Sequence, residues 1–68
     1  MIRINLLKDA MDRKNVTIDD LAEKLGISKQ SLYFRLNGKV LFKINEVRLI
    51  KNYLELESDI FNSIFFSE

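Results

Sequence analysis

Three consecutive polar residues, Lys29, Gln30 and Ser31, follow a short Gly-Ile-Ser turn and carry different hydrogen-bonding groups. A glutamine amide such as that of Gln30 can pair with adenine through two hydrogen bonds, and the ammonium of Lys29 can reach guanine or a phosphate. The nearby rings of Tyr33 and Phe34 can pack on thymine methyl groups or on another protein. These residue types indicate binding chemistry, and we expect nucleic acid as the ligand.

Catalytic chemistry is poorly represented in the same sequence. The chain contains no cysteine and no histidine, which excludes disulfides, thiolate and imidazole metal sites and the usual pairs of nucleophile and base. Asp19 and Asp20 resemble a carboxylate pair, but neighbouring residues point about 100° apart on a helix. In the first turn of a helix, both carboxylates interact favourably with the positive end of the helix dipole. We therefore expect neither an enzyme nor a bound cofactor or metal.

The polar residues lie within residues 17–38, where the sequence predicts two short helices joined by a turn. Thr17 is a good N-cap, and Asp20 can complete a short version of the capping box. Gly26 follows the first helix as the residue that adopts a left-handed conformation at little cost. Ser28 can then cap the second helix. The spacing predicts a helix-turn-helix.

Small and apolar residues stand where these two helices must meet. Leu21 and Leu25 share one face of the first helix, and Ala22 lies beside them where a larger side chain would keep a crossing helix away. Leu32 and Leu36 face inward from the second helix. The polar and aromatic residues of the second helix therefore face outward or along its flank.

The segment TIDDLAEKLGISKQSLYFRLNG resembles the helix-turn-helix of the lambda-repressor-like family, the phage Cro and repressor group also called XRE-type regulators. The alanine, the glycine four residues on, the turn GIS, the apolar Leu32 and the closing NGK match that family's pattern. INLLKDAMDRKN resembles the family's first helix, and NEVRLIKNYLEL with SDIFNSIFF resembles its last two. The resemblance covers nearly the whole chain. It implies binding of operator DNA through the second helix of the motif.

Two features depart from the family's pattern. The first residue of the first motif helix is often a glutamine that braces the phosphate contact, but here it is Ile18. The outer face of the reading helix is usually polar, whereas this one carries Tyr33 and Phe34. An aromatic pair at this position contacts either thymine methyl groups or a protein.

The remaining sequence predicts three further helices and no sheet. The first runs from about Arg3 to Lys14, the fourth follows Asn45 as N-cap with a hydrophobic staple of Ile44 and Leu49, and the fifth follows Glu57 or Ser58. We therefore expect an all-α, compact five-helix lambda-repressor-like domain that occupies residues 1–68 as a single unit. A core of this size is marginal without help, for which oligomerisation is one source.

The basic residues gather in one part of the sequence. Residues 24–51 hold seven basic residues and one acidic residue, a balance of +6, whereas the rest holds four basic and nine acidic residues, a balance of −5. We expect the basic part to contact phosphates and the acidic part to face away from DNA. The candidate phosphate contacts lie at helix ends or beside the second motif helix: Thr17, Arg35, Asn37, Lys39 and Lys43. Asn37 also suits a left-handed cap before Gly38.

An apolar cluster follows at the end of the chain and consists of Ile60, Phe61, Ile64, Phe65 and Phe66. Phe61 and Ile64 can close the core, but the face that the apolar residues span is wide for so short a helix, and Phe65 and Phe66 are less easily buried. We predict that the cluster forms a partner surface. Similar proteins form two-fold dimers through this region, which implies two reading helices about 34 Å apart on the duplex. The sequence does not distinguish a homodimer from a complex with a repressor protein.

The sequence therefore favours a phage or prophage transcription regulator of the Cro and repressor type that binds double-stranded operator DNA in a lysis-lysogeny switch. Its small size favours a Cro-like or modulator role. Two alternatives stay open: a modulator of repression or antirepressor that binds a repressor protein, and an antitoxin-type regulator. No stretch has the length of a membrane span and no signal peptide is visible, so we expect a cytoplasmic protein.

Overall fold

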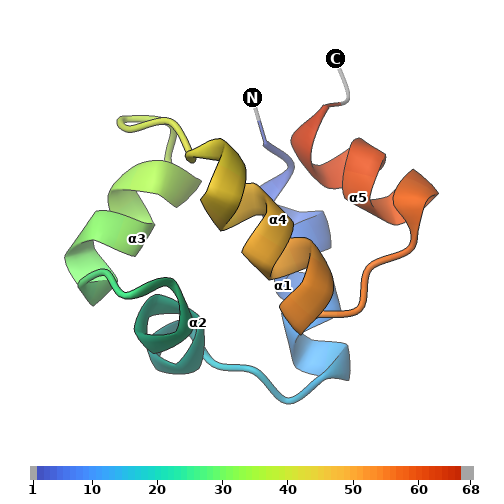
Figure 1. The fold of residues 1–68 in the computed structure, drawn as a ribbon, viewed down its shortest axis with the longest axis horizontal. Coiled ribbons are helices and arrows are strands. Elements are labelled where there is room, and N and C mark those ends of the chain that lie inside the picture. Colours follow the sequence, from blue (N-terminus) through green and yellow to red (C-terminus); the bar gives the residue numbers. More distant parts are fainter. Residues whose placement is uncertain (1, 67–68) are drawn as a thin grey trace.

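Five α-helices and no strand are present in residues 2–66, the part of the chain that the computed structural model describes. α2 packs against α3 and α4, and α1 packs against α5 (Figure 1). The expected all-α fold is confirmed for these residues. The helices are α1 (Ile4–Arg13), α2 (Ile18–Leu25), α3 (Lys29–Leu36), α4 (Ile44–Tyr53) and α5 (Ser58–Phe65).

The start of α2 is fixed by the predicted capping box. The Thr17 hydroxyl accepts a hydrogen bond from the backbone N–H of Asp20 at 3.1 Å, and the Asp20 carboxylate accepts one from the N–H of Thr17 at 3.0 Å. Gly26 ends the helix with φ of 72°, a left-handed conformation that a glycine adopts at low cost. Both predicted boundaries of α2 are confirmed.

α3 begins and ends as predicted, but the left-handed residue after it is not the predicted one. The hydroxyl oxygen of Ser28 accepts a hydrogen bond from the N–H of Ser31 at 3.0 Å, which confirms the cap. Asn37 has φ of −89°, so its predicted role as a left-handed cap is wrong. Gly38 holds the left-handed conformation instead, with φ of 81°, because it has no Cβ to clash with the backbone.

α4 begins earlier than the sequence indicated. Its N-cap is Lys43 rather than Asn45, and the N–H of Lys43 donates to the Glu46 carboxylate at 2.9 Å. The predicted staple of Ile44 and Leu49 is also wrong, since Ile44 is 67% exposed. Arg35 holds the Glu46 carboxylate beside the end of the loop, where it accepts the hydrogen bond from the N–H of Lys43. This contact sets the start of α4.

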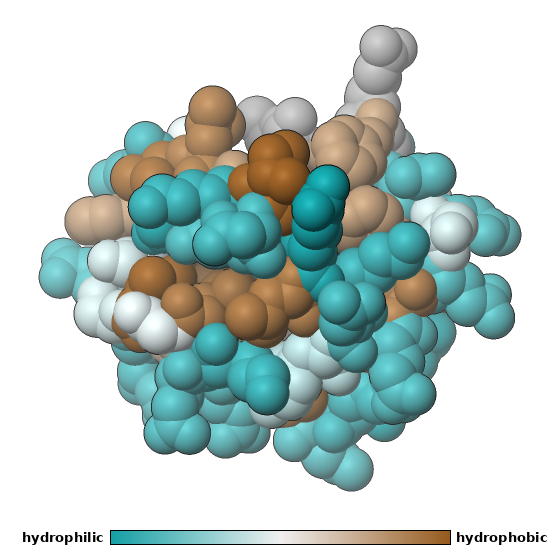
Figure 2. Space-filling view, viewed as in Figure 1, coloured by the Kyte–Doolittle hydropathy of each residue, from teal (hydrophilic) through white to brown (hydrophobic). Residues whose placement is uncertain are grey.

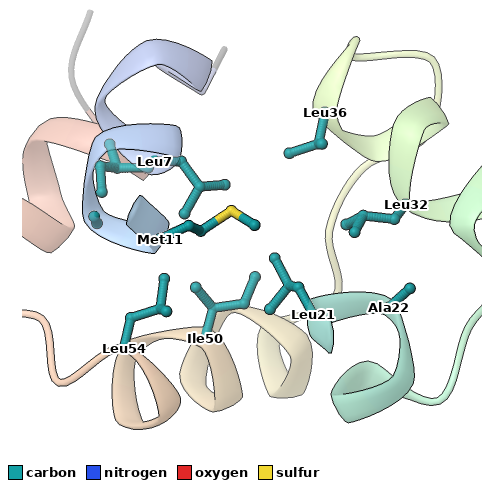
Figure 3. Packing of buried hydrophobic residues seen from close by; sticks show 10 residues of the cluster. Leu7, Met11, Leu21, Ala22, Leu32, Leu36, Ile50 and Leu54 are labelled. Carbon is teal, nitrogen blue, oxygen red and sulfur yellow. The ribbon is translucent and has the colours of Figure 1, made fainter. Parts of the chain in front are cut away.

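The core lies where all five helices meet, and it includes the residues of α2 and α3 that were expected where these helices pack or on the inward face of α3: Leu21, Ala22, Leu32 and Leu36. Figure 3 shows side chains from α1, α2, α3 and α4 converging on one space. Ala22 is 4% exposed and lies in the core where α2 and α3 pack. The crossing therefore uses the small side chain at the predicted position. The core residues are Leu7, Ala10, Met11, Leu21, Ala22, Leu32, Leu36, Ile50, Leu54 and Ile64.

The apolar residues of α5 divide between the core and the surface. Ile64 is fully buried and closes the core, one of the two roles that the sequence left open for it, so it does not contact a partner. Phe65 is half-buried and its ring packs edge-on against Phe42, with 5.7 Å between ring centroids. Ile60 is 37% exposed and Phe66 is 63% exposed, so these two ends of the cluster face outward. Ile64 and Phe65, which lie between these two ends, therefore pack against the rest of the protein and close the core.

Candidate nucleic-acid interface

Of the five residues predicted to read bases, Lys29, Gln30, Ser31, Tyr33 and Phe34, the first three form the N-terminal turn of α3, which presents two of them to solvent. Lys29 and Gln30 are exposed, and they stand directly after the capping residue Ser28. Ser31 is half-buried, and its hydroxyl accepts a hydrogen bond from the Ser28 hydroxyl at 3.0 Å. Ser31 therefore helps to fix the start of the helix, whereas Lys29 and Gln30 are the groups that reach outward.

Lys29 is held by a carboxylate of the preceding helix. Its Nζ lies 3.1 Å from Oδ1 of Asp19, and both side chains are more than half exposed. An exposed ion pair of this kind contributes at most about 1 kcal/mol. The pair orients Lys29 in the free protein, but a DNA phosphate or a guanine edge can replace Asp19 at small cost.

The aromatic residues of α3 lie on its outward side, as predicted. Tyr33 is 42% exposed and Phe34 is 37% exposed. The ammonium of Lys39 stands over the Phe34 ring at 5.6 Å from its centroid, a cation–π geometry that is worth about 0.5–1 kcal/mol at an exposed site. Phe34 therefore also orients the first cation of the loop after α3.

Arg35 does not reach the surface where phosphates would bind. Its Nε donates to Oε1 of Glu46 at 2.9 Å and its Nη2 donates to Oε2 at 3.2 Å, while Nη1 donates to the carbonyl of Ser31 at 3.2 Å. The two side chains are 11% and 8% exposed. The prediction of a phosphate contact at Arg35 does not fit this arrangement, because Glu46 and Ser31 accept hydrogen bonds from all three of its nitrogens and the side chain is only 11% exposed.

This ion pair fixes the geometry of the loop between α3 and α4. Burial alone raises the pKa of Glu46, but hydrogen bonds from Arg35 and from the Lys43 backbone, with the positive charges of both residues, hold that pKa below its ordinary value. Glu46 is therefore ionised at neutral pH. It joins the end of α3 to the start of α4 and sets the path of the residues between them.

The other predicted phosphate contacts surround α3. Thr17 is exposed at the start of α2, although its hydroxyl oxygen is used in the capping box. Asn37 ends α3, and Lys39 and Lys43 stand at the two ends of the following loop, all exposed. The structure thus places Lys29 at one end of α3 and two further cations at the other end.

Sequence reasoning missed two residues of this surface. Asp19 was assigned only to the helix dipole, and its pairing with Lys29 across the turn depends on how α2 and α3 cross. Glu46 was not assigned a role, although it is the one acidic residue in the basic part of the sequence. Its position among basic residues was the available signal, because a single acidic residue there is expected to form an ion pair with one of them.

The comparisons with known proteins agree with this geometry. A family model described as Helix-turn-helix matches residues 7–61, which include α2 to α4 and parts of α1 and α5. The chain belongs to this family, the lambda-repressor-like or XRE-type helix-turn-helix proteins, and is a DNA-binding transcription regulator. A comparison with curated proteins and one with solved structures gave no match. No helix within residues 2–66 is long and apolar enough to cross a membrane.

Proposed function

We propose that this chain regulates transcription from a phage or prophage operator by placing α3 in the major groove. One observation carries the reading role of α3: Lys29 and Gln30 are exposed side by side at its N-terminus, where the recognition helix of a helix-turn-helix contacts base edges. Cations at both ends of the helix support phosphate contacts beside it. Binding requires no cofactor and no catalytic step, and the proposed place of action is the cytoplasm.

The lysis-lysogeny role rests on the resemblance to phage Cro proteins and repressors. In this proposal two copies bind a two-fold operator, and Ile60, an exposed residue of the C-terminal cluster on α5, is the remaining candidate for their contact. A two-fold operator would place its half-sites about one helical turn apart.

Selection from a random duplex library tests this function. The protein is incubated with the library, bound duplexes are amplified over several rounds, and affinity for the enriched duplex is measured by fluorescence anisotropy. We expect a defined sequence that binds at least 10³-fold more tightly than its scrambled version. Enrichment of no sequence, with equal binding to both duplexes, would contradict specific operator recognition.

One observation favours a second candidate function, that of a modulator which binds a repressor protein. Tyr33 and Phe34 are exposed on the helix face where the family usually has polar residues. The double change Tyr33→Ser and Phe34→Gln separates the candidates. Loss of specific DNA binding with retained helical content supports the operator reader. Retained DNA binding together with loss of a stable complex with a co-purified repressor supports the modulator. An antitoxin role has no separate observation in its favour.

A further inference from the structure

A groove with an apolar lining lies beside the C-terminal end of α3 and takes no part in the proposed base reading. It has a volume of about 230 Å³ and is lined in part by Val40, Leu41, Ile44, Phe65 and Phe66. We call this surface the loop groove. Figure 2 shows apolar surface at the end of the molecule where Figure 1 places the α3–α4 loop. Its volume is below the roughly 300–1,000 Å³ of small-molecule sites, so side chains of another protein fit it better.

The exposed residues of the loop groove are unusually apolar for a surface. Leu41 is 84% exposed, Ile44 is 67% exposed and Phe66 is 63% exposed. These residues come from the loop, from the first turn of α4 and from the end of α5, so folding itself brings them together. Single exposed apolar residues need no explanation, but a contiguous apolar group marks an interaction surface. DNA offers no comparable apolar partner for it.

The charges around the loop groove identify the chemistry of its partner. Lys39 and Lys43 are exposed at the two ends of the loop that carries Val40 and Leu41. Among the described residues 36–54, the one acidic side chain is Glu46, and Arg35 already neutralises it. Neither lysine lines the groove itself, but each is the chain neighbour of residues that do. An apolar surface with exposed lysines beside it is complementary to apolar side chains flanked by carboxylates. A second copy placed two-fold on this surface would instead bring the same lysines together.

From this arrangement we propose that the loop groove binds an acidic amphipathic helix of another protein. Apolar residues of that helix at spacings of three and four occupy the groove, and its carboxylates pair with Lys39 and Lys43. The same two lysines are proposed phosphate contacts, so a bound helix would also weaken DNA binding. This last step rests on the proposed function, whereas binding of the helix does not.

The test uses a designed 18-residue helical peptide that has leucines on one face and glutamates on the other. A matched peptide carries lysine in place of every glutamate. Binding of the fluorescent peptides to the full chain is measured by anisotropy, and ¹⁵N chemical shifts map the contact. We expect the acidic peptide to bind at least tenfold more tightly than the basic one, with the largest shifts in residues 38–44 and 65–66. Equal binding of the two peptides, no binding, or shifts centred elsewhere would overturn the proposal.

Variants of the exposed residues make the test specific. Leu41→Ser should lower the affinity for the acidic peptide at least tenfold, whereas Leu41→Met should retain most of that affinity. Leu6→Ser is the matched control, because Leu6 is an exposed apolar residue of α1 outside the groove and its change should leave peptide binding unaltered. A Leu6→Ser effect equal to that of Leu41→Ser would show unspecific apolar binding and overturn the proposal.

Two further measurements separate the alternatives. Light scattering of the wild-type chain should give a mass that Leu41→Ser does not change; a dimer that this substitution dissociates would assign the groove to a second copy and overturn the proposal. In a competition, the acidic peptide should displace the selected duplex. If the peptide binds the groove but the chain binds no DNA, the proposed function fails and the groove assignment stands. If duplex binding persists with the groove occupied, the predicted competition is wrong.

Discussion

Lys29 and Gln30 stand in the same turn of α3 but are not equivalent. Lys29 is paired with Asp19 at 3.1 Å, whereas no partner of Gln30 is found among the described residues. A base contact by Lys29 therefore requires the loss of an exposed ion pair, and one by Gln30 does not. The sequence predicted both as base readers from their types and position. It did not predict the pair, since that contact depends on the crossing of two helices.

Gln30→Ala should weaken binding to the selected duplex by about 1–3 kcal/mol and change binding to a scrambled duplex much less, because an amide that reads adenine contributes only at its own base pair. Lys29→Ala should lower the binding free energy for the selected duplex by less than Gln30→Ala does. The reason is that wild-type Lys29 must give up its ion pair with Asp19 on binding, and the variant has no such pair to lose. Anisotropy titrations with both duplexes measure these differences. Equal losses on the two duplexes would show that the residue contacts phosphate.

At the scale of the elements, the sequence predicted helix boundaries well where residues close in sequence set them. It predicted them poorly where a contact between distant residues decides the boundary. The capping box of Thr17 and Asp20 and the left-handed Gly26 involve residues close in sequence, and all were predicted correctly. The start of α4 was predicted wrongly because Glu46 is held by Arg35, eleven residues earlier. The apolar face of α5 left core closure and partner contact open for Ile64, and the packing of α1 against α5 buries it.

Ala22→Leu should destabilise the fold by about 1–3 kcal/mol, because three added carbon atoms overpack the contact between α2 and α3. Glu23→Leu is the matched control, since it places the same side chain at the exposed neighbouring position. Urea unfolding followed by circular dichroism measures both variants. An Ala22→Leu protein as stable as the Glu23→Leu control would mean that the helices do not meet tightly at this residue.

Glu46→Gln should cost about 1–3 kcal/mol at pH 7, because it removes a charged hydrogen-bond acceptor and leaves Arg35 without its counter-charge. The native pKa of Glu46 is lowered, so the wild-type contribution is complete above the ordinary glutamate pKa of about 4.3 and is lost as pH falls through the native value. The stability difference between the proteins should therefore shrink in acid.

Unfolding free energies at several pH values between 7 and 3 measure this dependence. Glu55→Gln is the control: its carboxylate pairs with Lys14 at 2.8 Å on the exposed surface, where solvent screens the pair, and we expect little change in stability. A Glu46→Gln difference that stays constant down to pH 3 would contradict a stabilising, ionised Glu46.

At the scale of the whole molecule, the surface divides by charge and by polarity. The chain carries a net charge of +1, yet seven of its eleven basic residues lie in residues 24–51, which include α3 and the following loop. Lys29 stands at one end of α3, and Lys39 and Lys43 follow its other end. A nearly neutral protein can therefore present a positive surface to a duplex. The basic stretch was evident in the sequence, but the apolar loop groove beside it required the fold.

The salt dependence of affinity for the selected duplex tests the central claim, that the surface around α3 binds DNA. Three phosphate contacts per chain predict a fall of about 40-fold between 50 and 200 mM salt for one bound chain, and about 10³-fold for two chains. The changes Lys39→Ala and Lys43→Ala together should reduce the slope by about two per chain; Lys8→Ala on α1 is the control and should leave it unchanged. An affinity that does not change with salt, or a slope that the loop lysines do not affect, would contradict the assignment of this surface to DNA.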